Sequence, residues 1–456
     1  MVQNYDVIVI GGGPGGYTSA ISAAKNGKRT ALFEKADLGG TCLNVGCIPT
    51  KFLLDKAAAI EKIRDLTDKG IFREAGLFSF KKIQLEKGKV VKRLTNGVGA
   101  LLKKNGVDHY SGEAVLHTNR VVVSGGKEYT AEDVIIATGS EPMRIPIPGA
   151  ELAIDSTTAL NLEKVPPRLT VVGGGVIGLE MASAFASFGS EVTVVEVLEE
   201  LSPGEERTAV NQMKRALEKR GIKLLLGARI EEIKKADNGL TAVCRYQGEQ
   251  MRVAADQVLM AVGRKPRLDG INADLLGLKL TQKGFIAVDF RMRTSLPHVY
   301  AVGDVAGGYQ LAHAAFAEAE VAVSNICGKD TENNADYMPR CIYTTPAFAA
   351  VGITSAKAKE KGIDCISGSF PYEGNGMALA EGASGTIYVL MDTASKKTLG
   401  VQIVGEGAPE LVSFATAAVV NGTTLEEWER LVVAHPSLSE MIKEAALDCF
   451  GKAIHK

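Results

Sequence analysis

The chain has 456 residues, and its 46% hydrophobic and 23% charged residues exclude extensive disorder. The formal net charge of −1 gives no basic excess for nucleic acid and no acidic tail. No run of 18 apolar residues could cross a membrane, and the first residues lack the pattern of a signal peptide. We therefore expect a cytoplasmic protein of about three domains with neither nucleic acid nor membrane as partner.

The first predicted unit is a strand over Asp6–Ile10 followed by the glycine-rich turn Gly11–Gly16 and a helix of small residues. A second strand, Ala31–Glu34, ends in a carboxylate. In this dinucleotide-binding pattern one glycine makes the tight turn, one admits a pyrophosphate and one lets the helix pack closely. The candidate nucleotide-binding residues are Gly11, Gly13, Gly16 and Glu34.

Two cysteines, Cys42 and Cys47, follow in a glycine-rich segment. On a regular helix they would point about 140° apart at roughly 100° per residue. The nearby glycines permit a distorted turn that brings them within disulfide range. Pro49 suits the first turn of a helix running through 52–63, which places Cys47 at a helix N-terminus that favours thiolate. A redox pair is favoured over a metal site, which lacks further Cys or His nearby, and over two inert cysteines.

The glycine-rich unit occurs a second time. Thr170–Val172 leads into Gly173–Gly178, and Glu196 follows Gly173 by 23 residues, as Glu34 follows Gly11 by 23. Closing strands end at Gly139 and Gly263, and the first unit is 38 residues longer, so a cysteine-bearing insertion is expected near 38–75. Plain strand–helix turns are the alternative, but two full matches favour nucleotide sites. The second set of candidates is Gly173, Gly175, Gly178, Glu196 and Gly263.

The second nucleotide is predicted to be NAD. A carboxylate at Glu196 accepts hydrogen bonds from a ribose 2′-hydroxyl, whereas a 2′-phosphate requires arginine, and none occurs before Arg207. The alternative is an ordinary charge at a strand end. No metal is expected.

Proline-rich segments at 142–148 and 166–167 are predicted linkers. Beyond about residue 338 an α+β segment is expected, with strands near 341–351 and 400–404 and helices near 409–421 and 438–450. The remaining cysteines are expected to be small buried hydrophobes: Cys244, Cys327, Cys341, Cys365 and Cys449.

The segment Gly39–Lys51 resembles the redox-active motif of the flavin-dependent pyridine nucleotide–disulfide oxidoreductases, and the resemblance extends from Tyr5 to His455. Among that family, the chain is most similar to members that oxidise protein-bound dihydrolipoyl groups with NAD⁺. The resemblance implies an α/β fold of two nested Rossmann-like domains and an α+β dimerisation domain. The implied boundaries are 1–145 and 266–337 for FAD, 146–265 for NAD, and 338–456 for the interface.

The resemblance also implies roles for individual residues. In the FAD site, Glu34 would hold the adenosine ribose and Asp304 the ribityl chain. Lys51 would lie close to the isoalloxazine and pair with Glu180, while Val176 would stand where the nicotinamide enters. Further cofactor contacts are implied for Ala114, Thr138, Gly139 and Ala312.

For catalysis, the resemblance implies that substrate thiolate attacks Cys42 and that Cys47 lies next to the flavin. His435, oriented by Glu440, would act as base from the second subunit of a homodimer. The implied partner is a lipoyl-bearing protein of a 2-oxo acid dehydrogenase complex or glycine cleavage system. Another disulfide or metal-ion reductase of this fold, or a non-catalytic flavin sensor, are the alternatives. Thr50 is a minor departure from the family pattern. Further departures, expected to affect the interface and substrate channel, are Ala319, Ala347 and Met377.

Overall fold

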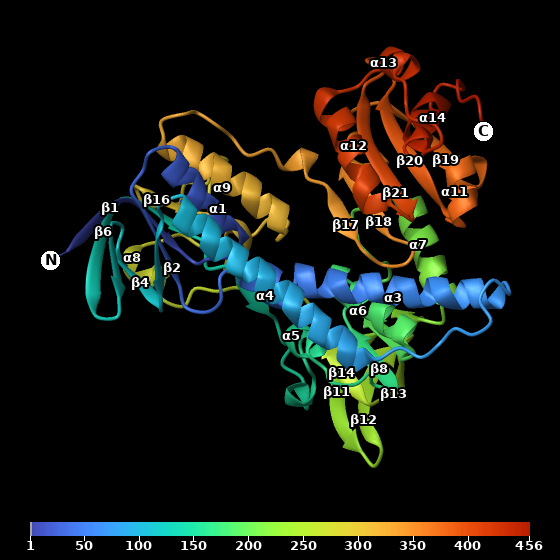
Figure 1. The fold of residues 1–456 in the computed structure, drawn as a ribbon, viewed down its shortest axis with the longest axis horizontal. Helices are drawn as coiled ribbons and strands as arrows, with labels where there is room; N and C mark the ends of the chain where they lie inside the picture. Colours follow the sequence, from blue (N-terminus) through green and yellow to red (C-terminus); the bar gives the residue numbers. More distant parts are fainter. Residues whose placement is uncertain (1) are drawn as a thin grey trace.

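A computed structural model describes residues 2–456 and confirms the α/β class, with two similar nucleotide-binding units and a C-terminal α+β unit (Figure 1). The first unit is built on β1 (Gln3–Ile10), whose register is parallel to both β2 (Thr30–Glu34) and β6 (Lys127–Ile136). The strand is buried on both faces of the sheet. Val7 packs in the apolar cluster under the helices on one face, and Ile8 packs in a separate cluster on the opposite face. This explains its continuous apolar run.

The remaining elements of the first sheet follow the order β3-β2-β1-β6-β5-β4. Helices α1 and α9 pack together over the face on which Val7 and Val9 lie. The bounds are α1 (Pro14–Lys25), β3 (Asp108–Ser111), β4 (Ala114–Thr118), β5 (Val121–Ser124) and α9 (Ala312–Ile326).

The insertion after Glu34 forms α2 (Gly40–Val45), α3 (Cys47–Asp68) and α4 (Phe80–Lys104). The helix expected through 52–63 is therefore longer than predicted. Gly46, at φ −144° and ψ −111°, interrupts the helix between the two cysteines. The expected distorted turn is thus a break between two helices, with Cys42 inside the first and Cys47 at the start of the second.

The second unit repeats the first. Its parallel sheet has the order β10-β9-β8-β14, matching β3-β2-β1-β6, and an antiparallel sheet of β11, β12 and β13 lies beside it. The bounds are β8 (Arg168–Val172), α6 (Val176–Phe188), β9 (Glu191–Glu196), α7 (Arg207–Lys219), β10 (Lys223–Leu226), β11 (Arg229–Ala236), β12 (Gly239–Tyr246), β13 (Glu249–Ala255) and β14 (Gln257–Met260).

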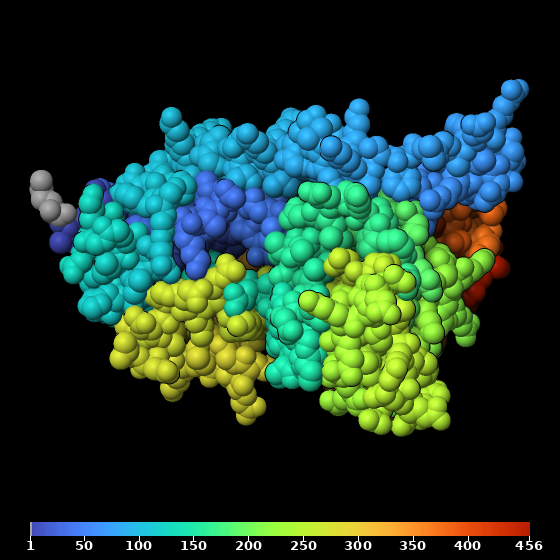
Figure 2. All heavy atoms as spheres, turned by 90° about the horizontal axis from the view of Figure 1, so that it is seen from below, coloured from blue at the N-terminus to red at the C-terminus, as the bar shows by residue number. Residues whose placement is uncertain are grey.

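The chain then returns to the first unit. β15 (Arg264–Pro266) pairs antiparallel with β7 (Ser140–Pro142), so the predicted linker begins inside a two-stranded ribbon. β16 (Val299–Ala301) then pairs in parallel with β6. Figure 2 shows the yellow residues of this returning segment beside the blue and teal first unit. Short elements complete this part: η1 (Ala150–Leu152), α5 (Ser156–Leu160), α8 (Ala273–Leu276) and η2 (Gly303–Ala306).

The C-terminal unit is an antiparallel sheet of order β17-β18-β21-β20-β19 covered by helices. The strand expected near 341–351 is two strands, because Pro346 lies between them and has no amide to donate. β19 and β20 were not predicted; β19 contains Gly368 and Pro371 and shows no clear alternation. The bounds are η3 (Ala335–Tyr337), β17 (Arg340–Ile342), β18 (Phe348–Gly352), α10 (Ser355–Glu360), β19 (Cys365–Pro371), η4 (Tyr372–Gly374), α11 (Gly376–Glu381), β20 (Gly385–Asp392), β21 (Thr398–Gly405), α12 (Ala408–Asn421), α13 (Leu425–Arg430) and α14 (Glu440–Asp448).

The five solitary cysteines differ in burial. Cys244 and Cys449 are buried as expected, but Cys327, Cys341 and Cys365 are only half-buried, so the expectation is wrong for these three. Each of the three lies at the end of a helix or on an outer strand of the sheet, where fewer neighbours cover it. Among the helices of residues 2–456, none is both long enough and apolar enough to cross a membrane.

Candidate active site

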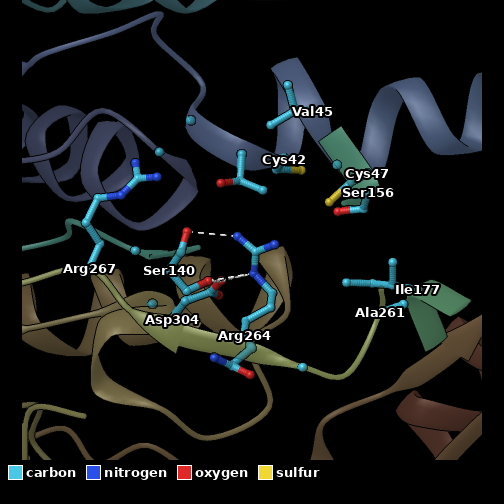
Figure 3. Close-up of a pocket in the computed structure, with 18 of the residues that line it drawn as sticks. Cys42, Val45, Cys47, Ser140, Ser156, Ile177, Ala261, Arg264, Arg267 and Asp304 are labelled. Atoms are coloured by element: carbon cyan, nitrogen blue, oxygen red, sulfur yellow. Dashed lines mark hydrogen bonds and ion pairs between the residues drawn. The ribbon is translucent and has the colours of Figure 1, made fainter. Parts of the chain in front are cut away.

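A cavity of about 1210 Å³ is lined by both glycine-rich turns and by the two cysteines (Figure 3). Most of the predicted nucleotide-binding residues contribute to its wall, from Glu34 in the first unit to Glu196 in the second. Those lining it are Gly11, Gly13, Glu34, Lys51, Ala114, Thr138, Gly139, Gly173, Gly175, Val176, Glu180, Glu196, Gly263, Asp304 and Ala312.

The two strand-end carboxylates have matching environments. Glu34 accepts a hydrogen bond from the amide of Gly12 at 2.6 Å, and Glu196 accepts one from Gly174 at 2.5 Å. The second oxygen of each carboxylate accepts a hydrogen bond from the main-chain amide two residues later, that of Ala36 for Glu34 and that of Leu198 for Glu196. Both carboxylates are thus held at the rim of a glycine turn by main-chain donors.

The glycines of each turn divide into two kinds. A Cβ on Gly16 would lie 1.8 Å from the Gly11 carbonyl oxygen, and one on Gly178 would lie 2.0 Å from that of Gly173. These third glycines do not line the cavity, and their close approach to a carbonyl fits the helix-packing role of the third glycine in the pattern. A Cβ on Gly175 would meet nothing within 4 Å and would project into open space.

This geometry fits a dinucleotide in each unit. Helices α1 and α6 begin at the turns with no side-chain cap on their first amides, which leaves main-chain donors for a pyrophosphate. A side chain at the second glycine would occupy the same space. The residues present therefore fit FAD in the first unit and a nicotinamide dinucleotide in the second.

Cys42 and Cys47 are both free thiols. A hydrogen bond from the Cys42 thiol lowers the pKa of Cys47, aided by the charge of Lys51, although burial acts in the opposite direction. The same hydrogen bond, together with burial, raises the pKa of Cys42. The pair is therefore polarised: the pKa of Cys47 is lowered and that of Cys42 is raised, so Cys47 is the thiol that ionises first.

Lys51, one turn along α3 from Cys47, forms an ion pair with Glu180 of α6 at 2.8 Å. The Glu180 side chain is buried and also accepts the amide of Tyr343 at 3.0 Å. The Lys51 ammonium lies 4.3 Å from the centre of the Tyr343 ring. Residues of three units thus meet beside the dithiol.

Arg264 was missed by sequence reasoning. Its guanidinium donates to the hydroxyl of Ser140 at 2.7 Å and lies 3.6 Å from the Asp304 carboxylate, to which Ser140 is also hydrogen-bonded (Figure 3). The sequence offered one indication of this role: Arg264 directly follows Gly263, a predicted nucleotide-binding residue. Glu318 was also missed: it accepts the amide of Gly303 at 2.7 Å, and burial raises its pKa to about 7.

His435 and Glu440 are not part of this cavity. The His435 Nδ1 lies 2.9 Å from Glu440, whose other oxygen accepts the amide of Ser437. Burial opposes ionisation of Glu440, but the bonds from Ser437 and His435 outweigh it and lower its pKa. The imidazole is 79% exposed. Within this single chain the dyad is formed but stands apart from the dithiol.

Residues 5–319 match the family described as pyridine nucleotide-disulphide oxidoreductase, and residues 338–446 match the dimerisation domain of the same family. The chain belongs to this family of flavin- and pyridine nucleotide-dependent oxidoreductases.

Individual relatives are similar over their full length. A dihydrolipoyl dehydrogenase of Bacillus subtilis (strain 168) is 40% identical, with 98% of this chain and 99% of the relative covered. One from Thermus scotoductus is also 40% identical, over 100% of this chain and 99% of the relative. Among solved structures, the HOCl-induced flavoprotein disulfide reductase RclA from Escherichia coli has a TM-score of 0.86 at 28% identity, with 97% and 99% covered.

Proposed function

We propose that this chain oxidises protein-bound dihydrolipoyl groups with NAD⁺, using the Cys42–Cys47 pair and FAD. One observation carries the proposal: the polarised dithiol lies in the wall of a cavity shared by two dinucleotide-binding turns. A dithiol there can exchange two electrons with a cofactor on one side and accept them from a thiol substrate on the other. The similarity to dihydrolipoyl dehydrogenases supports the choice of substrate.

In this proposal the first turn holds FAD, with Glu34 at the adenosine ribose, Asp304 at the ribityl chain and Lys51 near the ring system. Gly173, Gly175 and Glu196 hold NAD. FAD, when bound, passes the two electrons between the dithiol and NAD⁺. The ion pair of Lys51 with Glu180 keeps the ammonium directed toward Cys47, whose pKa it helps to lower.

The thiol chemistry starts from the Cys42–Cys47 disulfide. One substrate sulfur attacks Cys42 as a thiolate, the disulfide bond breaks, and Cys47 leaves as a thiolate. The second substrate sulfur then attacks the first, which releases Cys42 as a thiol. The substrate leaves as the cyclic disulfide and the protein is left with the dithiol.

His435 is the proposed base. Glu440 accepts from Nδ1, so Nε2 is free to take the substrate thiol proton. Because the dyad is exposed and stands apart from the dithiol of its own chain, it would act on the dithiol of a second copy. The proposal therefore includes a homodimer. It also includes the domain boundaries 1–145, 146–265, 266–337 and 338–456, a lipoyl-bearing partner protein and a cytoplasmic location.

The test is a comparison of dihydrolipoamide with NAD⁺ against oxidised glutathione with NADPH, in the FAD-loaded protein. We expect activity only with the first pair. Cys47→Ser should abolish dihydrolipoamide turnover, whereas Cys365→Ser, a half-buried cysteine outside the cavity, should leave it unchanged. Normal dihydrolipoamide turnover in Cys47→Ser would overturn the proposal.

A further inference from the structure

Lys87 is a buried lysine that the proposed chemistry does not use. It lies on α4 with 6% of its surface exposed, and its ammonium donates to the carbonyl of Leu160 and, at 3.2 Å, to the side-chain oxygen of Asn161. Its hydrogen-bond partners among residues 2–456 are a carbonyl and an amide oxygen, and neither is a carboxylate. Lysine is almost never fully buried without such a partner. Burial lowers the pKa of Lys87 to about 8, so the amine is still mostly protonated at neutral pH.

The groups that face Lys87 are the carbonyls at the end of the short helix α5. Gln84, one turn earlier on α4, donates to the Leu162 carbonyl at 2.9 Å. Residues three apart lie on the same face of a helix, so α4 caps the end of α5 with two side chains. The negative end of a helix favours a cation, which offsets part of the cost of burying the ammonium.

Hydrogen bonds add to packing at this end of α5, where the Leu160 side chain is buried in the apolar cluster. A second cavity, of about 780 Å³, is lined by Gln84, Lys87, Asn161 and Leu162. The caps therefore border open space on one side, although the Lys87 side chain is itself buried. If the bonds from Lys87 were lost, the end of α5 would have room to move.

The other end of α5 connects to the second nucleotide site. Ile154, just before the helix, exchanges main-chain hydrogen bonds with β14, and so belongs to the sheet of the second unit. Ser156 and Leu160 line the main cavity, and Figure 3 shows Ser156 on the same side of it as Cys47. The apolar side of α5 packs in one cluster with residues of α3 and α6. Helix α5 thus forms the part of the cavity wall that lies between the dithiol and the second glycine turn.

We propose that Lys87 is a positioning residue for the nicotinamide dinucleotide: by capping α5 it holds the wall between Cys47 and the second nucleotide-binding turn in place. The inference rests on the proposed function for the identity of that nucleotide. Lys87 itself touches neither the dithiol nor the second turn, and it acts through Leu160 and Asn161.

The experiment compares Lys87→Met with a matched control, Lys89→Met, in the FAD-loaded protein. Lys89 is on the same helix, and its side chain is 64% exposed and forms an ion pair with Glu86. We expect Lys87→Met to raise the KM for NAD⁺ about tenfold, as expected for the loss of roughly one hydrogen bond to a charged group. The KM for dihydrolipoamide should stay within about twofold. Hydrogen exchange of the amides in 156–161 should speed up by a similar factor. Lys89→Met should match the wild type in all three.

An unchanged KM for NAD⁺ together with unchanged exchange in 156–161 would overturn the inference. Gln84→Leu provides a second test, because it removes only the outer cap; it should produce a smaller change of the same kind, and wild-type exchange there would count against the inference. Anaerobic reduction of the bound flavin by NADH requires no dihydrolipoamide, so its dependence on NADH concentration measures nucleotide binding alone. A wild-type chain without dihydrolipoamide activity would therefore overturn the proposed substrate and still leave the role of Lys87 measurable.

Discussion

The ammonium of Lys51 lies 2.8 Å from the carboxylate of Glu180, although 129 residues separate them. Lys51 belongs to the helix that begins at Cys47, and Glu180 to the helix that begins at the second glycine turn. The ion pair therefore joins the dithiol to the second nucleotide unit. It also gives Glu180, whose side chain is only 4% exposed, the partner that a buried carboxylate requires.

Removal of one member of this pair should be more harmful than removal of both. Lys51→Met leaves the buried Glu180 carboxylate without its cation, at an expected cost of about 3 kcal/mol. Replacing both, as Lys51→Met with Glu180→Leu, should restore part of the loss, because no uncompensated charge remains. Thermal unfolding of the two single variants and the double variant measures this. Additive effects would show that the pair is not coupled.

The lowered pKa of Cys47 predicts an effect of its neighbour. Cys42→Ala removes the hydrogen bond that lowers the Cys47 pKa, so Cys47 should ionise at higher pH than in the reduced wild type. Cys42→Ser retains a hydroxyl donor and should preserve part of the effect. Ultraviolet absorbance of the thiolate, followed against pH in each reduced protein, ranks the three proteins by the pKa of Cys47. Equal titration of Cys47 in all three proteins would contradict the polarised pair.

The glycines of the second turn should fail in different ways. Gly175→Ala meets no protein atom within 4 Å, so the variant should fold normally and lose NADH affinity, because the methyl group takes the space of the pyrophosphate. Gly178→Ala places its Cβ 2.0 Å from the Gly173 carbonyl oxygen and should lower the unfolding temperature. Calorimetry measures the unfolding temperature of each variant and NADH titration measures its nucleotide affinity, which separates the two effects. Wild-type NADH affinity in Gly175→Ala would place the nucleotide elsewhere.

Glu196 should determine the preference between the two nicotinamide dinucleotides. Loss of hydrogen bonds to a charged group costs about 1.5–3 kcal/mol, so Glu196→Ala should raise the KM for NADH roughly tenfold or more. The KM for NADPH should change little, because its phosphate gains nothing from the carboxylate. Glu199→Ala, outside the cavity lining, is the control. Equal losses for both nucleotides would argue against ribose recognition by Glu196.

The buried Lys87 predicts a pH dependence of stability with a definite sign. Its pKa is about 8 in the folded chain against an ordinary value of 10.5, so the unfolded chain binds more protons between these two values. Stability contributed through Lys87 therefore rises as pH increases from 8 toward 10.5, by an amount on the order of 3 kcal/mol. Denaturant unfolding at pH 7.5 and 9.5 should show this rise in the wild type relative to Lys87→Met. A constant difference between the two proteins would contradict it.

Several features could be predicted because they are local in the chain. The glycine turns, Glu34 and Glu196 follow from main-chain requirements within about 25 residues of sequence, and the structure places both carboxylates on amides of their own turns. His435 and Glu440 are five residues apart, so their contact also needed little tertiary information. The strand β19 escaped prediction because its residues follow no clear alternation of buried and exposed positions.

The sequence by itself determined the repeated nucleotide-binding turns, the cysteine pair and the α/β class, because each depends on short-range backbone geometry and spacing. Only the tertiary structure decided what surrounds them. Arg264 joins Ser140 and Asp304, Lys51 joins Glu180, and Lys87 caps α5, all through contacts between residues far apart in the sequence. Such contacts depend on how separate helices and sheets pack, and side-chain hydrogen bonds that form on packing leave no periodic signal in the chain.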